Sequence, residues 1–71
     1  MSPICRLYTD PIKDSRTISE VMDACVDLKL PFYYSGRQRV IRAESRSLKR
    51  IIKLEFELRE LRVSYTKTFY R

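Results

Sequence analysis

The stretch that decides the fold is residues 45–71, SRSLKRIIKLEFELRELRVSYTKTFYR. Apolar residues recur along it at heptad spacing, which favours one long helix. Apolar and polar residues also alternate within it, which favours strands. Composition separates the two parts, because LKRIIKLEFELRE is rich in strong helix formers, whereas VSYTKTFY is β-branched and aromatic. We therefore expect a helix over about residues 46–59, capped by Ser45 or Ser47, and a final strand over about residues 61–70.

The N-terminal part of the chain predicts a strand followed by a helix. ICRLYT, residues 4–9, is a short β-prone run that ends at the turn-favouring loop DPIKDS. RTISEVMDACVDLKL, residues 16–30, carries apolar residues at helical spacing with acidic residues on the other face. Thr17 or Ser15 can cap this helix, and Pro31 ends it.

Between these regions, PFYYSGRQRVIRAES predicts a β-hairpin over residues 31–45. Two β-prone runs, FYYS and QRVIRAE, flank Gly36, which can take the positive φ that a tight turn requires. A two-residue turn at Gly36-Arg37 follows from this reading. That turn sets the register of two cross-strand pairs, Tyr33 with Val40 and Phe32 with Ile41.

The predicted order is strand, helix, strand, strand, helix, strand, within a single domain of residues 1–71. It is the order of the ferredoxin-like fold, an α+β arrangement with both helices on one face of a four-stranded antiparallel sheet. Two other arrangements stay open. One is a three-stranded sheet beside a long C-terminal helix that pairs with its copy in a dimer. The other is a winged helix, with residues 17–30 as the DNA-facing helix and residues 33–42 as the wing.

The composition argues against an enzyme. The chain has no histidine, so it lacks the commonest general base and a leading metal ligand. Cys5 and Cys25 have no CxxC spacing, and a single glycine excludes a glycine-rich phosphate loop. We expect no catalytic residue, metal or cofactor, and two buried, reduced thiols in a cytoplasmic protein.

We also expect no membrane partner, because no apolar run has the length of a span and the N-terminus lacks the pattern of a secretory signal.

Positive charge is concentrated in one segment of a chain whose formal net charge is +6. Between residues 37 and 53, seven arginines and lysines are opposed by Glu44 alone, whereas residues 1–30 are slightly acidic. A basic segment of this kind predicts a polyanionic partner, and nucleic acid is the first candidate. The candidate binding residues lie on the predicted hairpin and second helix: Tyr33, Arg37, Arg39, Arg42, Arg46, Lys49, Arg50 and Lys53.

Aromatic and basic side chains also share the sheet face that the helices leave uncovered. Strand alternation places on that face Arg6, Tyr8, Tyr33, Val40, Arg42, Arg62, Ser64 and Thr66. Rings surrounded by guanidinium groups are typical of single-stranded nucleic-acid recognition. We therefore expect a small, non-enzymatic regulatory protein that binds RNA or DNA and contacts its phosphates through the basic hairpin and helix.

The same surface allows a second hypothesis, because tyrosine and arginine are also enriched in protein interfaces. The protein would then be an inhibitor or adaptor of the kind that viruses and plasmids encode. It would bind an acidic surface of a host protein or nucleoprotein complex. A third option is a structural homodimer, with the uncovered sheet face as its interface.

Overall fold

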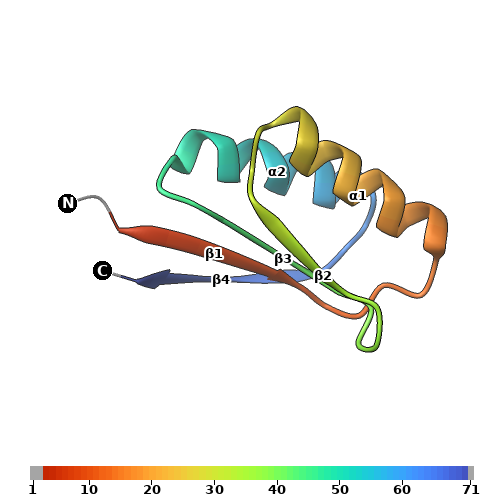
Figure 1. Ribbon diagram of the computed structural model, residues 1–71. Coiled ribbons are helices and arrows are strands. Elements are labelled where there is room, and N and C mark those ends of the chain that lie inside the picture. The colour runs from red at the N-terminus through yellow and green to blue at the C-terminus, as the bar shows by residue number, and fades with distance from the viewer. Residues whose placement is uncertain (1–2, 71) are drawn as a thin grey trace.

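The computed structural model describes residues 3–70 and contains six elements in the predicted order (Figure 1). They are β1 (Ile4–Thr9), α1 (Ser15–Asp27), β2 (Phe32–Ser35), β3 (Val40–Ser45), α2 (Leu48–Glu60) and β4 (Tyr65–Tyr70). The four strands form one sheet in the order β2-β3-β1-β4, every neighbouring pair is antiparallel, and both helices lie on one face. This confirms the ferredoxin-like arrangement. The alternatives with a long C-terminal helix or a winged helix are wrong.

The C-terminal stretch divides because α2 ends in a backbone motif that reverses the chain. Arg62 adopts a left-handed conformation with φ 59°. The Val63 N–H donates to the Leu58 carbonyl at 2.8 Å, and the Arg62 N–H donates to the Arg59 carbonyl at 3.1 Å. These two bonds are the Schellman pattern, which satisfies carbonyls at the end of a helix. The final strand therefore begins at Tyr65, and not at about residue 61 as the sequence predicted.

The start of α1 differs from the prediction. Asp14 is the N-cap, and its carboxylate accepts hydrogen bonds from the Arg16 N–H at 3.2 Å and from the Thr17 hydroxyl at 3.0 Å. Thr17 therefore supports the cap from inside the first turn, and Ser15 is the first helical residue. For α2, one of the two expected caps, Ser47, is confirmed.

The hairpin register also differs, because its loop has four residues, Gly36 to Arg39. Positive φ occurs at Arg39 (φ 57°) and not at Gly36. Tyr33 consequently pairs with Arg42, two residues further along than predicted. A shift of two preserves which side chains share a face. Phe32 is the register partner of the buried Ala43, so it lies on the helix side of the sheet, but β2 is an edge strand and Phe32 is 37% exposed.

The core lies between the sheet and the two helices. Both cysteines are buried in it and neither forms a disulfide, as the sequence predicted. Burial raises the pKa of the Cys25 thiol to about 11, and it also raises the pKa of Cys5. The buried apolar residues come from all elements except β2 and β4 and from the adjoining loops: Cys5, Leu7, Ile12, Ile18, Val21, Cys25, Leu30, Ile41, Ala43, Ile51, Leu54 and Leu58.

A buried carboxylate joins α2 to β4. Glu55 accepts a hydrogen bond from the Tyr65 hydroxyl at 2.8 Å and forms an ion pair with Lys67 at 3.1 Å. Burial by itself would raise the pKa of Glu55, but the hydrogen bonds from Tyr65 and Lys67 outweigh it and hold that pKa below its usual value. The charged carboxylate is therefore part of what keeps the edge strand β4 in place.

This contact predicts the pH dependence of folding stability. Because the pKa of Glu55 is lowered in the folded state, its contribution is fully present above the usual glutamate pKa and is lost as the pH falls through the folded value. We expect Glu55→Gln to lower the free energy of unfolding by about 1–3 kcal/mol at pH 7, and we expect the difference from wild type to shrink in acid. Urea unfolding at pH 7 and pH 3 measures both, with the exposed Glu57→Gln as control. A difference that grows in acid would contradict the assignment.

Candidate nucleic-acid interface

The uncovered face of the sheet is built from residues that alternate with the core. Along β1, Cys5, Leu7 and Thr9 are buried under the helices, so Arg6 and Tyr8 point to the other side. The strand register extends this face across the sheet in rows. The first row joins four strands through Tyr33, Arg42, Tyr8 and Thr66, and the second joins three strands through Glu44, Arg6 and Thr68.

Two arginine–tyrosine pairs on this face are in direct contact. The Arg42 guanidinium lies over the Tyr33 ring, 5.4 Å from its centroid, and the Arg6 guanidinium lies over the Tyr70 ring at 4.7 Å. Such cation–π contacts keep a ring and a guanidinium group together on an exposed surface. Tyr8 lies between the two pairs, because it is the register partner of Arg42 and shares one face of β1 with Arg6.

The electrostatics of this face follow from the same contacts. The neighbouring Tyr70 hydroxyl, and then the Arg6 guanidinium group, lower the pKa of Tyr8. Arg6 also donates from Nε to the Glu44 carboxylate at 2.7 Å, and this bond raises the pKa of Arg6. Within residues 3–70, Arg42 forms no ion pair. We call Tyr33, Arg42, Tyr8, Arg6 and Tyr70 the Tyr–Arg surface.

The structure changes the predicted membership of the uncovered face at β4. Arg62 and Ser64 are not on it, because they precede the strand. Thr68 and Tyr70 are on it, because they pair with Arg6 and Ile4 of β1. Tyr70 was missed in the sequence, although the alternation that places Thr66 on this face reaches it four residues later.

Arg39, one of the predicted binding residues, has a structural role in the loops. Its Nε donates to the Ile12 carbonyl at 2.8 Å. Its Nη2 donates to the Lys13 carbonyl at 2.8 Å and to the Ser15 hydroxyl at 3.2 Å. The guanidinium group therefore ties the β2–β3 loop to the β1–α1 loop and to the first residue of α1, and it is not part of the Tyr–Arg surface.

Four of the other predicted cations lie at the two ends of the sheet. Arg37 is exposed in the β2–β3 loop at one end. Arg46, Lys49 and Arg50 lie around the start of α2 at the opposite end, where Ile4 and Tyr70 also lie (Figure 1). The structure does not gather the predicted residues into one patch. It places Tyr33 and Arg42 on the Tyr–Arg surface and these four cations at the two ends of that surface.

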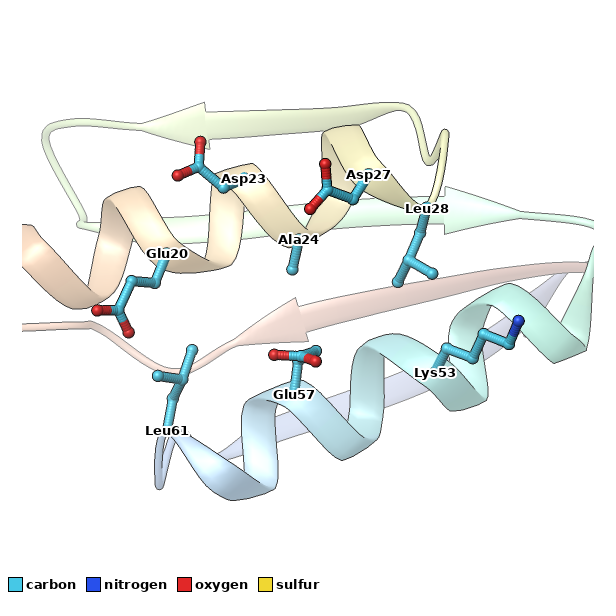
Figure 2. Close-up of a pocket in the computed structure, with 8 residues that line it drawn as sticks. All are labelled: Glu20, Asp23, Ala24, Asp27, Leu28, Lys53, Glu57 and Leu61. Carbon is cyan, nitrogen blue, oxygen red and sulfur yellow. The ribbon is translucent and has the colours of Figure 1, made fainter.

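Lys53 lies apart from these cations, in a groove of about 550 Å³ between the two helices (Figure 2). The floor of this groove is apolar, and its rim carries four carboxylates against the single lysine. The lining residues are Glu20, Asp23, Ala24, Asp27, Leu28, Lys53, Glu57 and Leu61. The helix side of the molecule thus carries an acidic groove, whereas the open sheet face and its two ends carry arginine and lysine.

Within residues 3–70, no group of three or more cysteine or acidic side chains is placed to hold a metal ion. Neither α1 nor α2 has the length and apolar character that a membrane span needs. Comparisons with protein-family models, with curated proteins and with solved structures found no match to this chain.

Proposed function

We propose that this protein is a small, non-enzymatic regulatory protein that binds RNA or DNA through the open face of its sheet. The observation that carries the proposal is the Tyr–Arg surface, in which two tyrosine–arginine contacts, Tyr33–Arg42 and Tyr70–Arg6, lie on either side of Tyr8 on a face that the helices do not cover (Figure 1). Bases stack on tyrosine rings and on guanidinium planes, while arginine also pairs with phosphate.

The distribution of charge indicates which side of the protein a nucleic acid would approach. The groove between α1 and α2 presents Glu20, Asp23, Asp27 and Glu57, which repel a polyanion. The opposite side presents arginines in a protein of net charge +6. A nucleic acid is therefore expected to approach the sheet and leave the helix layer facing solvent.

Phosphate contacts are expected at both ends of the Tyr–Arg surface. Arg37 lies beyond Tyr33 at the hairpin end, and Arg46, Lys49 and Arg50 lie at the end where β1 and β4 bring Ile4 and Tyr70 together. A nucleic-acid strand that lies across the open sheet face would contact cations on both sides of the tyrosine rings. Such contacts position the ligand without reading its sequence.

The proposal predicts that Arg42→Glu weakens oligonucleotide binding about tenfold or more, because it removes a charge-assisted contact and adds repulsion. Fluorescence anisotropy with labelled RNA and DNA oligonucleotides at low salt measures the effect. Arg16→Glu makes the same change of charge on α1, where Arg16 is exposed and paired with Glu20, and it should bind as the wild type does. Equal affinity of Arg42→Glu and wild type would contradict the proposal.

The second candidate is an inhibitor or adaptor that binds an acidic protein surface with the same side chains. It is favoured by the exposure of Tyr33 beside Arg42, since both residue types recur at interface hot spots. Affinity capture from a lysate, with and without nuclease, separates the candidates. A partner that survives nuclease and is lost in Arg42→Glu would favour the adaptor.

A further inference from the structure

We infer that the nucleic acid bound by this protein is single-stranded, with unpaired bases stacked on the Tyr–Arg surface. The inference rests on the proposed function and names its class of ligand. It follows from the width of the surface, from the exposure of its rings and from its low net charge.

The width of the surface does not suit a groove of duplex DNA. Tyr33 lies on β2 and Tyr70 on β4, the two edge strands. Three inter-strand spacings of about 4.8 Å separate these strands, so the Cα atoms of the two tyrosines lie about 14 Å apart across the sheet. The two Cα atoms are also offset by about 13 Å along the strand direction, because Tyr33 shares a row with Thr66, and Thr66 lies four residues before Tyr70. The major groove, about 12 Å wide, admits a helix or a two-stranded ribbon, and a four-stranded face is too broad.

The side chains of Tyr33 and Tyr70 are accessible to solvent. Tyr33 is 61% exposed and Tyr70 is 40% exposed, although each lies against a guanidinium group. The guanidinium group restricts the motion of its ring, which lowers the entropy lost when a base stacks there. In a duplex the base faces are already stacked on one another, so only an unpaired strand can use these rings.

The small number of cations on the surface also argues against a duplex as the ligand. Binding that depends on phosphate neutralisation needs many cations along the backbone. Apart from the four cations at its two ends, the Tyr–Arg surface has two, and Glu44 already pairs with Arg6 at 2.7 Å. Stacking must therefore supply much of the affinity, and stacking on aromatic side chains is tolerant of base identity.

The test compares one protein with four probes. Fluorescence anisotropy is measured with labelled 12-nucleotide single strands of mixed sequence, as RNA and as DNA, and with the matching 12-base-pair duplexes. We expect at least one single strand to bind about tenfold or more tightly than its duplex. We also expect Tyr33→Leu to weaken single-strand binding about tenfold and to leave duplex binding unchanged.

The outcomes separate this inference from the proposed function. Duplex binding that equals or exceeds single-strand binding overturns the inference while the proposed function stands. An equal loss of affinity for both kinds of probe in Tyr33→Leu also overturns the inference alone. Absence of saturable binding to all four probes overturns the inference and the proposed function together. Circular dichroism of Tyr33→Leu checks that the variant is folded, which is expected because the side chain is exposed on an edge strand.

Discussion

A variant with both Tyr33 and Tyr70 replaced by alanine should bind single-stranded oligonucleotides about a hundredfold more weakly than wild type. Removing a stacking ring costs about 1–3 kcal/mol per base, and 1.4 kcal/mol corresponds to a factor of ten. Because the two rings lie on opposite edge strands, their contributions should be nearly additive. Each single variant should therefore lose about tenfold. Anisotropy titrations of the three variants measure these losses.

The matched control is Phe56→Ala. Phe56 is also an exposed aromatic side chain, 59% accessible, but it lies on α2 and not on the open sheet face. Its removal should leave oligonucleotide affinity within twofold of wild type, a change of about 0.4 kcal/mol. Wild-type affinity in the double tyrosine variant, or an equal loss in Phe56→Ala, would show that the bound ligand does not use the Tyr–Arg surface.

The largest expected effect on stability comes from Leu58→Ala. The Leu58 side chain is fully buried between α2 and the sheet, and its carbonyl accepts the hydrogen bond that ends the helix. Truncating such a leucine leaves a cavity and costs about 2–5 kcal/mol. A domain of this size has a total stability near the low end of about 5–15 kcal/mol, so the variant should lose much of it.

Urea unfolding followed by circular dichroism measures the loss. Leu48→Ala is the control, because Leu48 is on the same helix but is 48% exposed. That change should cost less than about 1 kcal/mol, mostly through lost burial of a partly accessible side chain. Similar midpoints for Leu58→Ala and Leu48→Ala would contradict the packing of α2 described above.

The fold could be predicted from the sequence because its elements carry strong local signals. The change from helix formers to β-branched and aromatic residues divides the C-terminal stretch, and the structure confirms that division. The exact boundary could not be predicted, since the helix ends at a left-handed Arg62 where glycine is the usual signal. Lys29 ends α1 in the same way, with φ 56°.

The conformation of the hairpin loop also could not be predicted from the local sequence. Gly36 is the residue whose conformational freedom predicts a tight turn, yet Arg39 takes the positive φ in a four-residue loop. Three hydrogen bonds from the Arg39 side chain, to the β1–α1 loop and to the first residue of α1, hold it there. A tertiary contact of this kind has no local signature. The faces of Tyr33 and Arg42 were still predicted correctly, because an even shift in register leaves them unchanged.

The candidate site was predictable in part. Strand alternation places Arg6, Tyr8 and Arg42 on one face, and the register then brings them side by side. Lys53 follows the other cations in the sequence, but its position in an acidic groove depends on how α1 packs against α2. Helical periodicity gives the direction of a side chain and not the identity of the neighbouring element.

The most direct test of the central claim is an NMR titration of the ¹⁵N-labelled protein with an unlabelled 12-nucleotide single strand. The open sheet face should show saturable amide shift changes at Arg6, Tyr8 and Arg42. The α1–α2 groove should show none at Asp23 and Asp27. Shift changes confined to the groove, with the sheet amides unmoved at saturation, would contradict the account.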